Sequence, residues 1–153
     1  MLELNLPSYK YRIEQRDGKL AIFDPIRKKF IILTPEEWVR QHFLNYLNQH
    51  LNYPTTLTSV ETGLKYNTRV KRSDIMIMDN QLKPLALVEC KAPSVAVNEA
   101  TVRQLSVYNT VCKAKLIIVT NGMVTHAARC SESSDKFETL TQIPDYNSLK
   151  ALI

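Results

Sequence analysis

Hydrophobic and polar positions change their spacing along the chain, and these changes predict a series of short elements. Apolar stretches at 19–23 and 29–33 predict extended pieces in the first part of the chain. Apolar residues then recur at helical spacing from Val39 to Leu47, directly behind Thr34-Pro35-Glu36-Glu37. Thr is a good cap, Pro suits the first helical position, and acids favour the positive end of a helix dipole. The pattern therefore predicts a helix from Thr34 to about Leu47.

Two strongly apolar segments follow, after a loosely alternating strand-like stretch at 57–62. The segment 74–78 is apolar on both faces after its first residue, and the segment 85–91 is apolar on both faces until its last residues. Strands of this kind lie in the middle of a sheet that helices cover on both sides. A short polar turn at 80–84 joins them, which favours an antiparallel hairpin.

The second half of the chain predicts one strand–helix–strand unit and several smaller elements. A helix at about 98–111 lies between the segment 85–91 and an apolar strand at 116–119. That order favours a right-handed crossover with parallel strands. Further strands are predicted at 123–130 and 137–140, and a short closing helix at 145–152. The expected fold is an α/β domain on a mixed sheet.

The composition is that of an ordinary globular domain. With 153 residues, of which 44% are hydrophobic and 23% charged, the chain can bury one compact core. No apolar run approaches the ~18 residues of a membrane span, and the N-terminus has no apolar signal-peptide core. We therefore expect a cytoplasmic protein without a membrane partner. Cys90, Cys112 and Cys130 match neither a zinc pattern nor a disulfide framework, which predicts buried free thiols.

The net charge of +5 is compatible with a polyanionic partner but does not identify one. Its distribution is more informative. A first basic cluster, Arg27, Lys28 and Lys29, is typical of a solvated loop. A second cluster precedes Asp74 and comprises Lys65, Arg69, Lys71 and Arg72. For this second cluster, contact with phosphate and simple solvation are equally supported.

Candidate chemistry gathers at the ends of the two central strands. Residues two apart in a strand point to the same side, so Glu89 and Lys91 share a face with Leu85 and Leu87. Asp74 opens the partner strand and can meet Glu89 across the hairpin. Two carboxylates at the edge of a dry sheet are costly unless something neutralises them. Mg²⁺ does so naturally, because it prefers carboxylate oxygens, retained waters and substrate phosphates.

This arrangement predicts phosphodiester hydrolysis with Mg²⁺ (or Mn²⁺). Asp74 and Glu89 would hold the metal, and the backbone carbonyl of Cys90 is a plausible further ligand. Lys91 would orient the attacking water and stabilise charge in the transition state. The alternative is a surface salt bridge among Asp74, Glu89 and Lys91, because Glu-x-Lys is common on exposed strands.

The same residues resemble the PD-(D/E)xK nuclease core, through RSDI (72–75) and LVECKAP (87–93). More closely, the chain resembles the N-terminal nuclease domain of type I restriction enzyme R subunits. The matching segments include LTPEEWVRQ (33–41), YP (53–54) and VTNG (119–122). The similarity covers about 22–124. It implies a restriction-endonuclease-like, three-layer fold, with a central mixed sheet flanked by helices, that acts on DNA with Mg²⁺.

The resemblance gives meaning to further positions. Gln104 and Tyr108, at i and i+4 of the second helix, match the Gln-x-x-x-Tyr motif shared with RecB-like nucleases, where it lies beside the metal and the DNA. An ordinary helix surface pair is the alternative. Many such nucleases also use an acid of the first helix, here Glu36 or Glu37, and Glu37 is preferred. With Arg69, Lys71 and Arg72, the residues Gln104 and Tyr108 are expected to contact DNA.

Two departures from the family pattern limit what the resemblance implies. Ser73 replaces the usual proline before the first acid, and the chain has no Walker-type Gly-rich loop. We therefore expect a single nuclease-like domain over 1–153, with its core at about 33–125, an extended N-terminal part at 1–32 and a C-terminal strand and helix at 126–153. A separate motor or specificity subunit would be its partner. The alternative function is a DNA-binding or assembly module that keeps the nuclease fold without cleaving.

Overall fold

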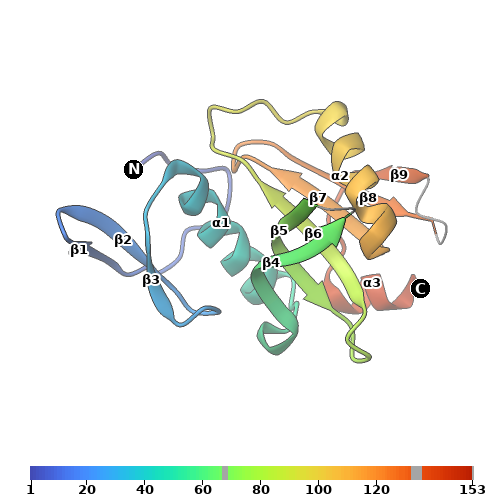
Figure 1. Cartoon of the computed structure of the whole chain (residues 1–153), viewed down its shortest axis with the longest axis horizontal. Coiled ribbons are helices and arrows are strands. Elements are labelled where there is room, and N and C mark those ends of the chain that lie inside the picture. The colour runs from blue at the N-terminus through green and yellow to red at the C-terminus, as the bar shows by residue number, and fades with distance from the viewer. Residues whose placement is uncertain (67–68, 132–135, 153) are drawn as a thin grey trace.

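The computed structural model, which describes residues 1–66, 69–131 and 136–152 without the side chains of 62–73, is built on a six-stranded sheet (Figure 1). In their order across the sheet, the strands are β4 (Thr58–Tyr66), β5 (Arg69–Met78), β6 (Pro84–Cys90), β7 (Leu116–Thr120), β8 (Thr125–Cys130) and β9 (Phe137–Leu140). β6 and β7 pair in parallel, and the other neighbouring pairs are antiparallel. The predicted hairpin, the parallel pairing of the two strands on either side of the second predicted helix and the mixed α/β fold are confirmed.

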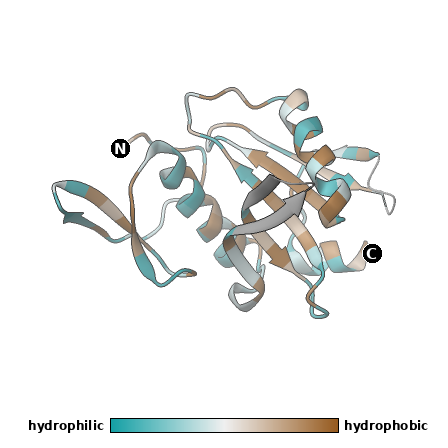
Figure 2. Ribbon diagram, viewed as in Figure 1, coloured by the Kyte–Doolittle hydropathy of each residue, from teal (hydrophilic) through white to brown (hydrophobic). Residues whose placement is uncertain are grey.

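Helices cover both faces of this sheet and make three layers. Helix α1 (Pro35–Asn45) and helix α3 (Tyr146–Ala151) pack into one apolar cluster with the inward side chains of β5 to β8. Helix α2 (Glu99–Cys112) packs on the opposite face. The apolar colour in Figure 2 follows the central strands, which agrees with the two-faced apolar pattern of their sequences. Both central strands are thus fixed from above and below, and they hold the residues at their ends in place.

Local sequence signals set the ends of the helices. Thr34 caps α1, and its hydroxyl accepts the backbone N–H of Glu37 at 3.0 Å. Helix α1 ends at Asn45 and continues as a π-helical turn over Tyr46–His50, so the predicted helix to about Leu47 is confirmed with a change of geometry. Asn98 caps α2 through a capping box with Thr101. A short 3-10 turn at Thr55–Leu57 leads into β4.

The N-terminal residues form a second sheet at one end of the molecule (Figure 1). Its antiparallel strands are β1 (Ile13–Arg16), β2 (Lys19–Asp24) and β3 (Lys29–Ile32). The pattern predicted the last two strands but not β1, whose residues are mostly exposed and carry no apolar alternation. Ile22 is fully buried in the α1 cluster, so this sheet is anchored to the main core.

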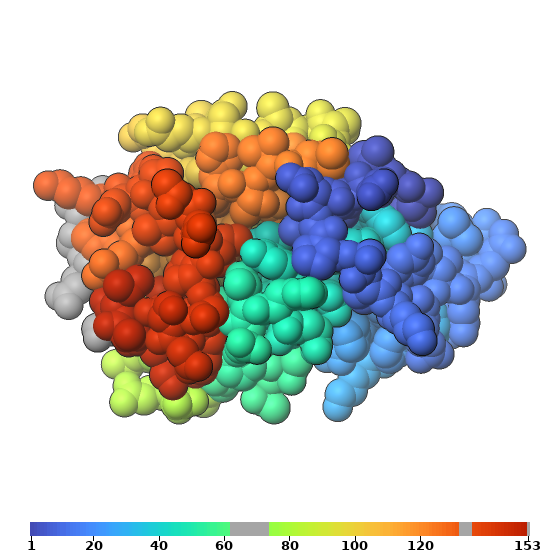
Figure 3. All heavy atoms as spheres, turned by 180° about the vertical axis from the view of Figure 1, so that it is seen from behind, coloured from blue at the N-terminus to red at the C-terminus, as the bar shows by residue number. Residues whose placement is uncertain are grey.

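The chain before β1 is pinned to the turn between β7 and β8. The backbone N–H of Asn5 donates to the carbonyl of Gly122 at 2.8 Å. Gly122 has φ +83°, and a Cβ there would lie 2.8 Å from a methyl carbon of Leu4. Only glycine accepts both this backbone and this close approach. Figure 3 shows the result, with the N-terminal segment in blue lying across the back of the molecule.

Two expectations about the central hairpin are wrong. β5 begins at Arg69, so Asp74 lies inside the strand and does not open it. The polar residues before Asp74 extend the strand because main-chain pairing with β4, such as Thr62 opposite Ser73, needs no apolar side chain. The second error concerns Leu85 and Leu87, which were expected to share one face of β6. Leu85 packs in the α1 cluster, whereas Leu87 packs on the α2 side. A register shift at the neighbouring end of β5 interrupts the simple alternation there.

The expected states of the cysteines are confirmed: Cys90, Cys112 and Cys130 are buried and free. Across the described ranges, no helix combines the length and the apolar character needed to cross a bilayer.

Candidate functional site

The two predicted acids lie on neighbouring strands at the same end of the β5–β6 hairpin. The last pair of the register at this end is Ile75 with Val88, and Asp74 and Glu89 are the next residues beyond it on each strand. Lys91 follows β6 directly, and its Nζ lies 2.9 Å from Glu89 Oε1. The side chains of Glu89 and Lys91 are each about one-third exposed, and the Glu89 hydrogen bond raises the pKa of Lys91. Lys91 is therefore a cation that solvent can reach.

Both carboxylate oxygens of Asp74 are already hydrogen-bonded. Oδ1 accepts from Arg40 Nη2 of α1 at 2.6 Å, and Oδ2 accepts the backbone N–H of Cys90 at 2.7 Å. The carboxylate is thus fixed between the helix and the neighbouring strand. Cys90 contributes its N–H to the site, and the role of its carbonyl as a metal ligand stays a prediction. Burial, and then the charge of Asp74, raise the pKa of the Cys90 thiol, which makes it a poor nucleophile.

Arg40 is the residue on which the carboxylates of this region converge. Its side chain is only 5% exposed. Among the described side chains, four carboxylates lie within 4 Å of its guanidinium group, those of Glu36, Glu37, Glu61 and Asp74. Burial alone would lower the pKa of Arg40, but the hydrogen bond to Asp74 and the charges of Glu37 and Asp74 raise it instead. Arg40 is therefore a permanent buried cation beside the candidate metal ligand.

The two acids at the start of α1 have different environments. Glu37 is buried, and its carboxylate accepts hydrogen bonds from Arg27, Arg40 and Gln41. Arg40 lies between Glu37 and Asp74, so the structure does not bring the preferred helix acid to Asp74 directly. The Glu36 side chain is 46% exposed, and burial followed by the charge of Asp74 raises its pKa. Glu36 is therefore the helix acid that faces the predicted trio.

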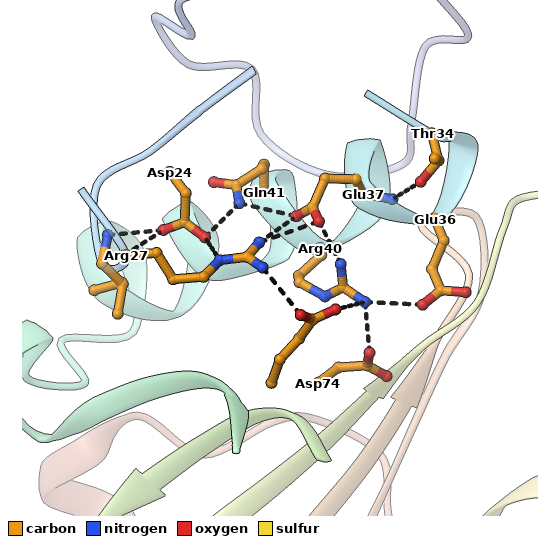
Figure 4. Close-up of polar contacts among 10 residues, drawn as sticks. Asp24, Arg27, Thr34, Glu36, Glu37, Arg40, Gln41 and Asp74 are labelled. Atoms are coloured by element: carbon orange, nitrogen blue, oxygen red, sulfur yellow. Dashed lines mark hydrogen bonds and ion pairs between the residues drawn. The ribbon is translucent and has the colours of Figure 1, made fainter. Parts of the chain in front are cut away.

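A second buried arginine extends this network to the N-terminal sheet (Figure 4). Arg27 bonds Asp24 Oδ2 through Nε at 2.6 Å and Glu37 through Nη2 at 3.0 Å. Asp24 is fully buried, and its other oxygen accepts the backbone N–H of Ile26 and of Arg27. Although burial alone would raise the pKa of Asp24, the hydrogen bonds from Arg27 and Gln41 and the charge of Arg27 lower it. A continuous chain of polar contacts therefore runs from Asp24 to Asp74.

This network corrects the interpretation of the first basic cluster. Lys28 and Lys29 are exposed, as a solvated loop predicts, but the side chain of Arg27 is only 15% exposed and carries buried ion pairs. The turn around Asp24 directs Arg27 inward, which residue type alone does not indicate.

The charges around α1 are unbalanced in a way that suits a further cation. Among the described side chains, five carboxylates, those of Asp24, Glu36, Glu37, Glu61 and Asp74, lie around two guanidinium groups, those of Arg27 and Arg40. Lys91 is a further cation close enough to act on Glu36 and Asp74. Oxygen donors with excess negative charge are the chemistry that Mg²⁺ and Mn²⁺ prefer, so the residues fit such an ion. In the described part of the chain, however, no three side chains of His, Cys, Asp or Glu already converge as a ready ligand set.

The predicted DNA contacts are placed less favourably. Gln104 is exposed, whereas Tyr108 is only 6% exposed and packs with Leu105 and Cys112 between α2 and the sheet. The two residues therefore do not share one exposed surface, because the apolar stripe of α2 includes Tyr108. The side chains of Arg69, Lys71 and Arg72 lie outside the described residues, so their role stays a prediction.

Sequence reasoning missed Asp24, Arg27, Arg40 and Gln41. A local signal existed for two of them, since Arg40 and Gln41 lie four residues after Glu36 and Glu37, the spacing of helix side-chain pairs. Nothing in the sequence indicated that Asp24 and Asp74, which come from two different sheets, would meet this face of α1.

Comparison with known proteins identifies the family. The family model described as "Type I restriction enzyme R protein N terminus (HSDR_N)" matches residues 35–144. No curated protein matches the chain at a significant level. Among solved structures, a fragment assigned to the HsdR subunit of a type I restriction enzyme from Vibrio vulnificus YJ016 aligns with a TM-score of 0.56 at 16% identity, over 78% of this chain and 25% of that chain. At this identity the match shows the fold alone, while the family match covers most of the residues that build the site. The chain therefore belongs to the family of type I restriction enzyme R protein N-terminal domains.

Proposed function

We propose that this protein is a metal-dependent deoxyribonuclease of the PD-(D/E)xK type. The observation that carries the proposal is that Asp74 and Glu89 directly follow the last β5–β6 pair, Ile75 with Val88, while the Lys91 ammonium lies on Glu89. Membership of the type I restriction R protein family supports DNA as the substrate. Together these observations favour a nuclease over an ordinary surface salt bridge.

Asp74, Glu89 and Glu36 would hold Mg²⁺ or Mn²⁺. Such an ion, when bound, would neutralise charge on the scissile phosphate and lower the pKa of a bound water. Arg40 and the Cys90 N–H hold the Asp74 carboxylate in a fixed orientation before substrate arrives. Lys91, whose pKa is raised, stays protonated and can donate to the attacking water or to a phosphate oxygen as negative charge develops.

The setting of this activity is also part of the proposal. The chain spans a quarter of the HsdR fragment that it resembles, so partners of the whole enzyme do not transfer automatically. We infer a cytoplasmic nuclease domain that acts on DNA together with a motor or specificity component.

A second candidate function rests on a specific observation. Arg40 already neutralises Asp74, as it would in a domain that keeps the nuclease fold for DNA binding or assembly without cleaving. Activity and metal binding distinguish this module from a nuclease.

The direct test is cleavage of plasmid and linear DNA by the purified protein with Mg²⁺ or Mn²⁺. We expect cleavage that EDTA abolishes, and a loss of about 100-fold in Lys91→Ala, because one transition-state donor is removed. The exposed Lys83, in the turn before β6, provides the matched control, and Lys83→Ala should cleave like wild type. Equal cleavage by wild type and Lys91→Ala would contradict the site. No cleavage, together with no metal-dependent stabilisation, would support the non-cleaving module.

The two helix acids give a paired prediction. Glu36→Gln should lower cleavage at least about tenfold, a cost of about 1.4 kcal/mol, and leave the free energy of unfolding nearly unchanged, because the side chain is half-exposed. Glu37→Gln should lower the free energy of unfolding by about 2 kcal/mol, because its buried hydrogen bonds join charged groups. Urea unfolding and initial cleavage rates measure both effects. The reverse pattern would make Glu37 the site acid.

A further inference from the structure

A single nitrogen of Arg40 carries the contacts to both candidate ligands on its side of the site. Nη2 lies 2.6 Å from Asp74 Oδ1 and 2.8 Å from Glu36 Oε1. The other terminal nitrogen, Nη1, bonds Glu37. The guanidinium group therefore has one end on the structural network of α1 and the other end on the residues that would hold a metal (Figure 4).

The position of Arg40 is set by charge at the expense of hydrogen bonding. Its Nε is buried and has no hydrogen-bond partner within the described residues. Leaving a buried donor unpaired is costly, so the ion pairs with the surrounding carboxylates must stabilise the side chain in this position. Those carboxylates outnumber the two arginines of the cluster. The cluster can therefore accept more positive charge, but Arg40 Nη2 already occupies the position next to Asp74 Oδ1.

We propose that Arg40 is a built-in counterion that competes with the divalent cation for Asp74 and Glu36. In the metal-free protein, Nη2 neutralises the two carboxylates. When a divalent cation binds, Nη2 releases them while Nη1 keeps its bond to Glu37, so the helix stays attached to the network. This inference rests on the metal site of the proposed function.

Competition predicts the direction of one measurable effect. A unit positive charge beside Asp74 opposes the approach of a dication, and the low exposure of Arg40 limits screening by solvent. Removing the charge should therefore tighten metal binding. If Arg40 served only to orient Asp74, its removal would loosen binding instead. The two roles thus differ in the sign of the change.

The experiment measures Mn²⁺ binding to the whole chain without DNA, by the electron paramagnetic resonance of free Mn²⁺. Arg40→Gln should bind Mn²⁺ at least about tenfold more tightly than wild type. Arg103→Gln provides the matched control, because Arg103 forms an exposed pair with Glu99 on α2 and the net charge changes equally. Its affinity should equal that of wild type. Unchanged or weaker binding in Arg40→Gln overturns the proposal.

A further pair of measurements covers the case in which Arg40→Gln does not fold alone. The proposal then expects Mn²⁺ to restore the circular dichroism of the native protein, since the ion replaces the missing cation. Failure of millimolar Mn²⁺ to do so overturns it. In Asp74→Asn, the additional Arg40→Gln change should give no gain in Mn²⁺ affinity, and a persisting gain also overturns the proposal. Tighter Mn²⁺ binding without DNA cleavage would instead reject the nuclease function and leave the competition standing.

Discussion

Replacing Arg27 with methionine is expected to lower the free energy of unfolding by about 3–5 kcal/mol, the usual cost of removing one partner from a buried ion pair. Arg27 is the common counterion of Asp24 and Glu37, which are both almost completely buried. Methionine fills much of the same volume, so the loss reports mainly on charge. Without Arg27, the carboxylate of Asp24 loses its ion-pair partner, and Glu37 keeps only Arg40.

Urea unfolding at several pH values tests this prediction. In the variant, Glu37 keeps Arg40, but the fully buried Asp24 loses its cation. Burial raises the pKa of Asp24, and the opposing hydrogen bond and charge of the Arg27 side chain are gone, so the pKa of Asp24 in the folded state rises. A buried acid without a cation destabilises the folded state when it is ionised, and protonation removes this cost. The difference in free energy of unfolding between Arg27→Met and wild type should therefore be largest near pH 7 and shrink as the pH falls toward about 4. Arg103→Met, at the exposed pair on α2, should cost about 0.5 kcal/mol or less at every pH. If Arg27→Met lost as little free energy of unfolding as Arg103→Met, the structural role of the network would be contradicted.

The network matters for function because it links the N-terminal sheet to the candidate site. Asp24 at the end of β2 holds Arg27, Arg27 holds Glu37, and Arg40 joins Glu37 to Asp74. Four ion pairs in series therefore connect the N-terminal sheet to Asp74.

Apolar spacing was sufficient to predict most elements of the main domain. The helix behind Thr34, the two central strands, the crossover helix and the strand at 116–119 all lie where the pattern placed them. These elements are buried on one or two faces, and a buried face requires apolar residues at a regular spacing that can be recognised in the sequence. β1 and the first half of β5 were missed because their residues need only main-chain partners, which leave no apolar pattern.

The buried charges could not be predicted in the same way. Arg27 looks like a member of a basic loop cluster, and Arg40 looks like a surface residue of an amphipathic helix. Each becomes buried only because acids from other elements converge on it, and such long-range pairs have no fixed spacing in the sequence. Tyr108 shows the reverse case, since the motif that suggested a DNA contact coincides with an ordinary core position of α2.

The geometry of the Glu89–Lys91 contact also does not reveal its role. A salt bridge and a catalytic pair both place Nζ on the Glu89 carboxylate, so the distance of 2.9 Å is compatible with either. What separates them is chemistry: a salt bridge at one-third exposure contributes little to stability and nothing to a reaction. A substitution at Glu89 therefore decides between the two interpretations.

Glu89→Gln is expected to lower the rate of DNA cleavage by about a thousandfold or more, because the loss of one metal ligand removes several kcal/mol of transition-state stabilisation. The free energy of unfolding should change by less than about 1 kcal/mol, since the side chain is partly exposed. Single-turnover cleavage at saturating Mn²⁺, together with urea unfolding, measures both. Glu99→Gln, at the exposed pair with Arg103, should leave both unchanged. If Glu89→Gln cleaves within a few-fold of wild type, Glu89 and Lys91 form only a surface pair, and the metal must lie elsewhere.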